Sequence, residues 1–232
     1  MAYIGSQPAN KPVVASDLDP AVITGQTALA VAPADTDEFL ISDAGTLKRL
    51  DASLIGGGAL NFLNSQTASS STSVAFSSTY ITSTYEVYKI FATDIIGASD
   101  NQNFRVHYSD DNGSNYDKTF RMAVIGLGDA GGGTPVYNQE TSGSGSTTMN
   151  ASSPGNATAE QNNFEFTLYK PSGGFGYAHY IMALGAANNR MNIQTGALRV
   201  GESDAINNIK FDFASGAIAS GTFRLYGIVN SS

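Results

Sequence analysis

The stretch FRVHYSDDNGSNYDKTF, residues 104–120, contains the two signals that decide the fold. Phe104, Val106 and Tyr108 alternate with polar residues, and a period of two is the pattern of a strand with one buried face. Asn112-Gly113 follows directly, and Asn-Gly is the strongest short signal for a β-hairpin turn. We therefore expect a hairpin that joins Tyr108 to a second strand containing Phe120.

The same alternation recurs along the chain from residue 60 onward. Short apolar runs are separated by clusters of Gly, Ser, Asn and Asp, which is the pattern of an all-β sandwich or barrel. The runs expected to form strands are 85–90, 104–108, 119–127, 164–168, 177–184, 191–200, 209–213 and 223–229. About eight strands is the number in a jelly roll, and no window shows helical periodicity. The sequence predicts an all-β fold, with residues 59–232 forming a jelly-roll-like antiparallel β-sandwich head.

Four of these runs are apolar at more positions than one buried face requires. They are 85–90, 119–127, 177–184 and 191–200. We expect the corresponding strands to have mixed faces or to be buried on both sides, because strands that are covered on both faces read as nearly continuous apolar runs.

Residues 35–58, DTDEFLISDAGTLKRLDASLIGGG, precede the predicted head. Asp43-Ala44-Gly45 lies between the apolar runs 39–41 and 47–50, and a short connection containing glycine predicts a hairpin. Because a two-stranded hairpin is only marginally stable in water, this one should need a partner surface. Gly56, Gly57 and Gly58 follow it as a candidate hinge.

The leader, residues 1–34, holds four of the seven prolines, so long helices and central strands are both disfavoured there. We expect an extended segment, with at most a turn of helix or a short strand, that becomes ordered by docking. Residues 128–162 are rich in Gly, Ser, Thr and Asn and are predicted to be a long loop that serves as a contact surface. Residues 65–73 resemble them and are predicted to be a shorter loop.

Composition excludes several classes of protein. A net charge of −8 with twelve scattered basic residues argues against nucleic acid as a partner, because such binding depends on clustered Lys and Arg. The chain has no cysteine and therefore neither disulfides nor thiolate chemistry. No apolar run is long enough to predict a membrane span, and the N-terminus lacks the apolar region of a signal peptide.

No catalytic, cofactor-binding or metal-binding site is predicted with a specific signal. Gly126–Gly131 spells G-x-G-x-x-G, but glycines and a proline follow it where a dinucleotide site needs a helix, so a glycine-rich turn is expected. Asp110, Asn112 and Ser114 have calcium-loop spacing, yet the required Gly and Glu positions hold other residues. A structural metal held between chains stays open. His107 and His179 are interpreted as sheet-face residues, and no G-x-S-x-G nucleophile motif is present.

Exposed tyrosines are the remaining candidates for contact with a ligand. Aromatic side chains offer flat faces on which sugars stack, and most phenylalanines fall on predicted buried faces. Tyr116, Tyr137 and Tyr169 lie near predicted loops and are the candidate surface contacts, against the alternative that they pack at the rim of the sheets.

Five phrases of the sequence resemble a group of short virion structural proteins of tailed bacteriophages, in particular of phages that infect aquatic bacteria. These phrases are MAYIGSQPA (1–9), ADTDEFLISDAGTLKRLDASLI (34–55), YITSTYEVYKI (80–90), YSDDNGSNYD (108–117) and SGTFRLYGI (220–228). Proteins of this kind are described as tail-fibre, head-fibre or decoration proteins. The resemblance implies an N-terminal particle-anchoring segment, a short neck and a β-sandwich head that associates as a trimer. It supplies no catalytic residues.

The expected function is that of a non-enzymatic virion structural protein without cofactors. Residues 1–58 would be the anchor and hairpin neck, and would contact phage capsid or tail proteins. The head would be a homotrimer, either a short fibre or a capsid decoration (cement) protein. It would be made in the cytoplasm of the bacterial host and located in the virion. The alternative is a tail-fibre receptor-binding protein that binds a host-surface carbohydrate, with no nucleic-acid or membrane partner in either case.

Overall fold

The computed structural model describes residues 19–27, 33–34, 36–52, 60–128, 136–150, 154–174, 176–186, 190–201 and 203–228. The chain separates into two compact units, Met1–Gly56 and Gly57–Ser232. The described part of the chain contains no helix that is long and apolar enough to span a membrane.

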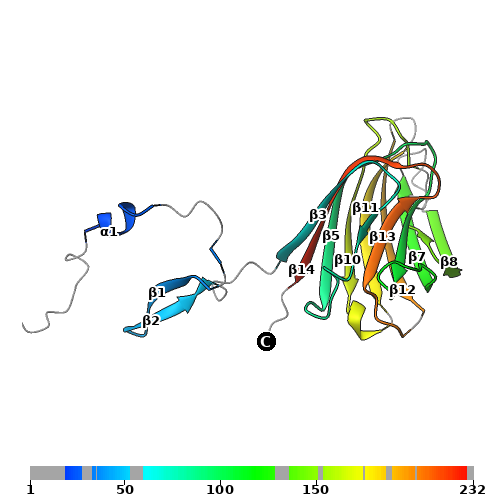
Figure 1. The fold of residues 1–232 in the computed structure, drawn as a ribbon. Coiled ribbons are helices and arrows are strands. Elements are labelled where there is room, and N and C mark those ends of the chain that lie inside the picture. Colours follow the sequence, from blue (N-terminus) through cyan, green and yellow to red (C-terminus); the bar gives the residue numbers. More distant parts are fainter. Residues whose placement is uncertain are drawn as a thin grey trace, which may run out of the picture. The chain divides into compact units, whose positions relative to one another are not determined.

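The first unit contains one turn of helix and one hairpin (Figure 1). Helix α1, Ala21–Thr24, begins where the Ala21 amide donates to Asp19 Oδ1 at 2.9 Å. Strands β1, Glu38–Asp43, and β2, Thr46–Asp51, pair antiparallel along their whole length. Ala44 and Gly45 connect them with positive φ angles of 50° and 82°, as a two-residue type I′ turn requires. The predicted hairpin is therefore confirmed.

The second unit is built from two antiparallel sheets (Figure 1). One has eight strands in the order β3-β14-β5-β10-β11-β12-β7-β8, and the other has four in the order β4-β13-β6-β9. The strands are β3 Leu60–Ser71, β4 Val74–Phe76, β5 Val87–Gly97, β6 Phe104–Ser109, β7 Thr119–Gly128, β8 Val136–Ser144, β9 Thr147–Thr148, β10 Asn162–Tyr169, β11 Tyr177–Ala186, β12 Arg190–Val200, β13 Asn208–Phe213 and β14 Ile218–Ile228. A 3-10 turn, Pro171–Gly173, precedes β11.

The strand order contains a complete jelly roll. A jelly roll places its first, eighth, third and sixth strands in one sheet and its second, seventh, fourth and fifth in the other. Taking β3, β4, β5, β6, β9, β10, β13 and β14 as those eight strands reproduces both orders, β3-β14-β5-β10 and β4-β13-β6-β9. The pairs β7–β8 and β11–β12 are insertions that extend the first sheet beyond β10. The predicted all-β sandwich is confirmed, and its topology is that of an enlarged jelly roll.

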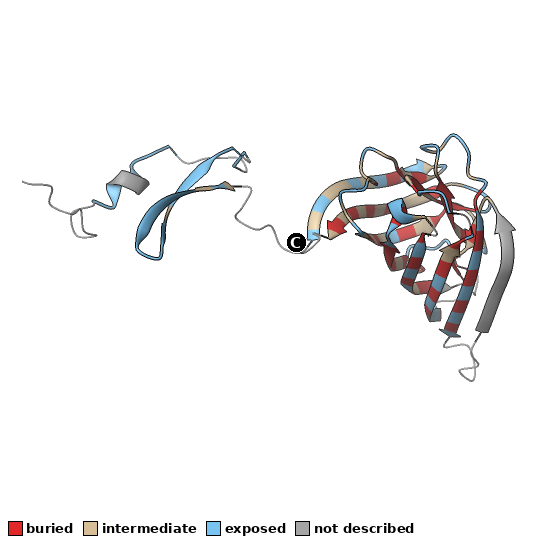
Figure 2. Cartoon of the chain, turned by 90° about the horizontal axis from the view of Figure 1, so that it is seen from below, coloured by how far each residue is buried: buried red, intermediate tan, exposed pale blue. Residues whose placement is uncertain are grey.

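Inward-facing apolar side chains from both sheets form one core. Phe211 of β13 lies at its centre, fully buried, with ring contacts to Phe104, Phe164, Phe166 and Phe223 at centroid distances of 5.4–6.0 Å. These partners come from both sheets, so the aromatic cluster joins the two layers. Buried and exposed residues alternate along the strands of the head, whereas the hairpin has no buried residue (Figure 2).

The predicted hairpin at Asp110–Gly113 is wrong about its strands. Asn112 and Gly113 do adopt the positive φ angles of a type I′ turn, 62° and 87°. However, β6 pairs with β13 and β9, whereas β7 pairs with β12 and β8. The connection therefore crosses from the small sheet to the large one. The turn chemistry is local, but the choice of strand partner depends on the rest of the sandwich.

Two predicted loops contain strands. The polar excursion 128–162 includes β8 and the two-residue strand β9, and residues 65–71 belong to β3. These segments lack strong apolar alternation because β3 and β8 are the outermost strands of the large sheet and β9 is an outermost strand of the small one. Backbone pairing orders these segments, and β3 has a single buried residue, Ala68, so its sequence pattern gives little sign of a strand.

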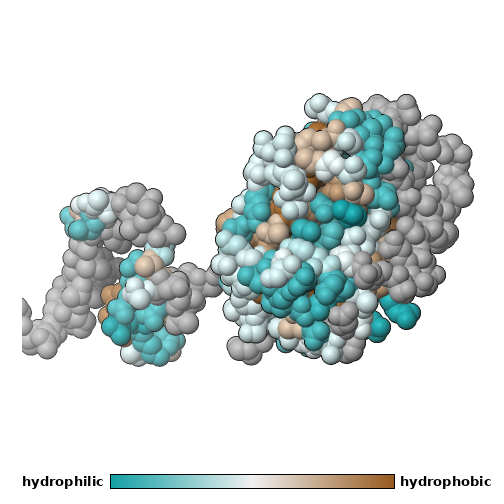
Figure 3. Space-filling view, turned by 45° about the vertical axis from the view of Figure 1, so that its right-hand side comes forward, coloured by the Kyte–Doolittle hydropathy of each residue, from teal (hydrophilic) through white to brown (hydrophobic). Residues whose placement is uncertain are grey.

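The surface is dominated by uncharged polar residues. On the side of the head visible in Figure 3, hydrophilic and nearly neutral residues cover most of the area, with small hydrophobic patches between them. Only 14% of the residues are charged.

Candidate functional site

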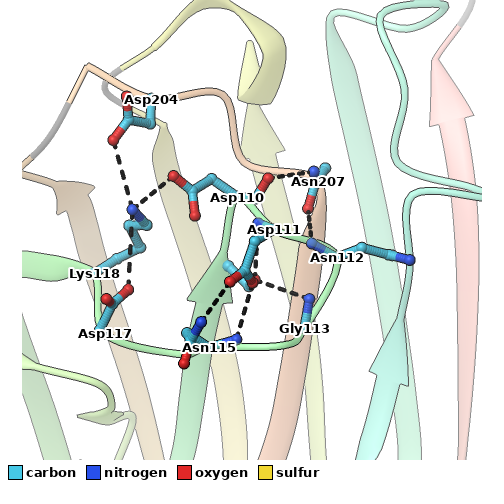
Figure 4. A network of polar contacts seen from close by, with 10 residues as sticks. Asp110, Asp111, Asn112, Gly113, Asn115, Asp117, Lys118, Asp204 and Asn207 are labelled. Carbon is cyan, nitrogen blue, oxygen red and sulfur yellow. Dashed lines mark hydrogen bonds and ion pairs between the residues drawn. The ribbon is translucent and has the colours of Figure 1, made fainter.

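The loop between β6 and β7 holds the densest polar network of the described head (Figure 4). Ser109 Oγ donates to Asp111 Oδ1 at 2.6 Å, and Asn115 donates to the same carboxylate from its backbone amide at 2.9 Å and from Nδ2 at 2.7 Å. These hydrogen bonds, that from Ser109 first, lower the pKa of Asp111 to about 2. The Asp111 carboxylate thus holds the loop together by accepting hydrogen bonds from Ser109 and Asn115.

A lysine fastens this loop to the segment before β13. The Lys118 Nζ lies 2.7 Å from Asp110, 3.5 Å from Asp204 and 3.9 Å from Asp117. The Lys118 side chain is only 9% exposed, and its ammonium lies among the carboxylates of these three aspartates. Asn207 adds to the connection, because its Oδ1 accepts from the Asn112 amide and its Nδ2 donates to the Asp110 carbonyl. The three aspartates therefore neutralise the Lys118 ammonium.

The calcium-loop spacing does not produce a converging set of ligands. Asn112 Oδ1 accepts from the Ser78 amide, and Ser114 Oγ donates to the Asp111 carbonyl. Asp110 is engaged by Lys118. No group of three or more His, Cys, Asp or Glu among the described residues could hold a metal ion.

His107 is the more buried of the two histidines. Its Nδ1 lies 2.9 Å from the Gly145 carbonyl, and its Nε2 lies 2.9 Å from Asp212 Oδ1 without the alignment of a good hydrogen bond. Arg105 Nε donates to the same oxygen at 2.8 Å. Burial, the largest single effect, raises the pKa of Asp212. The hydrogen bonds and charges of His107 and Arg105 together lower it by more, so the pKa of Asp212 lies below its ordinary value. The cluster ties β6 to β13 and to the turn before β9.

His179 lies on the outer face of the large sheet. Its Nε2 is 3.0 Å from Thr195 Oγ1, and that hydroxyl donates to the Tyr180 carbonyl. Both histidines are therefore on strands, as predicted, and they belong to different sheets. The contacts given above for the two rings include no serine.

Tyr116 is a structural residue in the described loop. The Lys210 ammonium lies 3.9 Å from its ring centroid, the ring of His107 packs edge-on against it at 5.7 Å, and its hydroxyl donates to Asn208 Oδ1. Burial, followed by the charge of Asp111, raises the pKa of Tyr116. The Lys210 ammonium lies over the ring, so Tyr116 is not an open stacking platform.

Tyr169 is the last residue of β10, in the large sheet. It is exposed and pairs across the strands with the exposed Tyr177 of β11. Tyr137 belongs to β8, but its side chain lies outside the described residues, as do Gly56, Gly57 and Gly58. The structure does not bring Tyr116 and Tyr169 to one site, because Tyr116 contacts the small sheet and Tyr169 belongs to the large one.

The G-x-G-x-x-G run begins within a strand. Gly126 and Gly128 are the last part of β7, and the next described element is β8, which pairs back on β7. The described surroundings are those of a β-hairpin, and the dinucleotide interpretation does not apply.

Sequence reasoning missed an exposed apolar area on the outer face of the large sheet. Ile125, Leu127, Ile181 and Ile193, here called the outer isoleucine patch, line a groove of about 310 Å³ together with Gln194 and Thr195. The available signal was the excess of apolar residues in 119–127, 177–184 and 191–200, from which we expected strands with mixed faces or strands buried on both sides.

Comparisons with protein-family models, curated proteins and solved structures give no match to this chain. The fold and the contacts above define the protein as an acidic jelly-roll protein that carries a separate hairpin unit.

Proposed function

We propose that this chain is a non-enzymatic structural protein of a bacteriophage particle, a trimeric short fibre or capsid decoration protein attached through residues 1–58. The observation that carries the proposal is the hairpin unit, which presents apolar residues on both faces and buries none of them. The resemblance of five phrases of the sequence to phage virion proteins points to the same assignment.

The hairpin lacks the second layer that a stable sheet needs. Leu40 is 75% exposed, and it shares one face with Leu47 and Arg49, while Phe39, Ile41 and Leu50 lie on the other. A two-stranded sheet without a packed face is marginal in water. A large preassembled surface such as a capsid or tail would supply that layer, and docking would then both order the hairpin and attach the head.

The test places charges on the hairpin of the full-length chain. Particles are assembled with the Leu40→Asp/Leu47→Asp variant, and the amount of protein per purified particle is measured by quantitative mass spectrometry. We expect at least a tenfold loss of incorporation. The control is Ala98→Asp/Thr158→Asp, which adds the same two charges at exposed turns of the head and should leave incorporation unchanged. Normal incorporation of the hairpin variant would refute docking through this segment.

Two roles within this class make opposite predictions for particles that lack the protein. A decoration role predicts capsids that lose resistance to heat or osmotic shock while adsorbing normally. A receptor-binding role predicts normal particle stability with defective adsorption. We favour decoration or a short fibre because few residues separate the hairpin from the head, which gives little reach.

Tyr169 and Tyr177 favour the receptor-binding alternative. They are exposed cross-strand neighbours, and Arg199 pairs with Tyr177 in the next strand, which gives aromatic faces beside a hydrogen-bond donor. Binding of the head to a host-polysaccharide array that disappears in Tyr169→Ala/Tyr177→Ala would support a carbohydrate site. Absence of binding by the wild-type protein would remove it.

A further inference from the structure

The outer isoleucine patch is a continuous apolar surface on three neighbouring strands. Ile193 of β12 pairs with Leu127 of β7, and Ile181 of β11 is linked to Ile125 of β7 through Thr195. Their side chains are between 47% and 57% exposed. The strands position them as a block on the face opposite the core.

These strands have the composition of strands covered on both sides. In β7, Met122 and Val124 face the core, whereas Ile125 and Leu127 face outward. Strands with one solvated face normally alternate apolar with polar residues, and continuous apolar strands normally have both faces covered. Among the described residues, only the inner face is covered, so the apolar outward positions of β7 and β12 resemble those of strands with a second cover.

The apolar side chains of the patch are contiguous and well exposed. Met191, which is 59% exposed, adds to it, and the largest apolar patch on a typical monomer is itself about 300–600 Å² and often functional. On the same sheet face, the ring of Tyr226 contacts those of Phe62 and Phe91 edge-on. A standard interface buries ~800 Å² per partner, so a contact over this face would extend beyond the outer isoleucine patch.

Charge indicates what covers this face. Lys89, Arg121, Arg199 and Arg224 occupy its outward positions, against Glu165 and, at the bulge of β5, Asp94. The face is thus positive in a chain whose net charge is −8. The remainder of the same chain is correspondingly acidic, so another copy offers the complementary surface. Two such faces placed against each other would instead bring basic residues together.

We propose that the outer isoleucine patch binds a second copy of this chain in a head-to-tail contact, in which the acidic surface of one head covers the patch of the next. Such heterologous contacts form closed rings when the rotation closes. The inference rests on the homotrimer in the proposed function and identifies the surface that holds it together.

The test measures the mass of the full-length chain by light scattering after size exclusion. The wild-type protein should have three times the 24.2 kDa of one chain, and Ile193→Asp should have the mass of one chain. Because Ile193 is exposed, the variant should keep the wild-type circular dichroism spectrum. The matched control, Thr158→Asp in an exposed turn of the head, should stay oligomeric. A monomeric wild type, an oligomeric Ile193→Asp variant or a dissociated control would each overturn the proposal.

A second measurement uses the absence of cysteine from the natural chain. Ile193→Cys should react with a bulky maleimide at least tenfold more slowly at micromolar than at nanomolar concentration, whereas Thr158→Cys, in an exposed turn, should react equally at both. Equal rates for Ile193→Cys would overturn the proposal. Neither measurement involves particles, so a trimer that fails to join virions would contradict only the proposed function.

Discussion

The hairpin and the head are built from the same kind of strand but differ completely in burial. Phe39 of the hairpin pairs with Leu50 and is still 41% exposed, whereas Phe211 of the head is 0% exposed. Both lie in antiparallel strands. The difference teaches that strand pairing alone buries little side-chain surface, and that a second sheet is needed to exclude water. Among the described residues, the head buries its own core, whereas the hairpin buries no residue.

The largest expected effect compares two phenylalanines. Phe211→Ala should lower the free energy of unfolding of the head by about 3–5 kcal/mol, because it leaves a cavity among four aromatic partners. Phe39→Ala should change it by less than about 0.5 kcal/mol, as expected for an exposed position. Urea unfolding followed by tyrosine fluorescence measures both. Similar losses for the two variants would mean that the hairpin shares the core of the head.

The second effect compares two aspartates with cationic partners. Asp212→Asn should cost about 2–3 kcal/mol, because Arg105 loses a largely buried counter-charge. Asp43→Asn removes the exposed contact with Lys48 and should cost less than about 0.5 kcal/mol.

The pH dependence of the same variants gives an independent measurement. Since the folded-state pKa of Asp212 is lowered, its contribution is complete above the ordinary value of 3.8 and disappears as the pH falls through the folded-state pKa. Thermal unfolding between pH 2 and pH 7 should show a smaller acid-induced loss of stability in Asp212→Asn than in the wild type. An unchanged acid profile would contradict the assigned role.

The third comparison is between two buried tyrosines, for which substitution by Phe should change the free energy of unfolding in opposite directions. Tyr180 donates its hydroxyl to the Met149 carbonyl, so Tyr180→Phe should cost about 1–2 kcal/mol. Tyr108 has no hydrogen-bond partner among the described residues, so Tyr108→Phe should stabilise the head by about 1 kcal/mol. Burial raises the pKa of both hydroxyls. Equal losses in urea unfolding would show that Tyr108 has a partner.

The smallest effect lies in the exposed β6–β7 loop of the head. NMR titration of the Asp111 carboxyl should give a pKa of about 2, and Ser109→Ala should raise it towards 3.8 by removing the strongest of its hydrogen bonds. Because the folded-state pKa is lowered, the loop gains stability from Asp111 above 3.8 and loses it as the pH falls through about 2. The control Ser69→Ala, at an exposed site in β3, should leave this titration unchanged.

Local signals in the sequence predicted local structure well. Gly45 and Asn112-Gly113 all adopt the positive φ angles of tight turns that these residue types favour. The alternating runs at 104–108, 164–168, 209–213 and 223–229 correspond to β6, β10, β13 and β14, with the predicted faces inward. These features depend on residues close in sequence, and for that reason a single chain reveals them.

The candidate surface was much less predictable. Tyr116 was a candidate for an exposed contact or for packing at the rim, and Lys210, from a distant position in the sequence, lies over its ring. The runs that contain Ile125 and Ile193 were expected to have mixed faces or to be buried on both sides, and no other part of the described chain covers these two residues. Contacts between residues far apart in sequence decide both outcomes, and periodicity contains no information about which strand or sheet will lie opposite.

The sequence by itself determined an all-β protein with a hairpin before a β-sandwich, because alternation and turn residues act over a few positions. Only the tertiary structure decided that β6 and β7 enter different sheets, that two strand pairs extend one sheet of the jelly roll, and that this extension carries a bare apolar face. The physical reason is that a face is buried only when a second layer packs on it, and the residue pattern of a strand does not show which layer that will be.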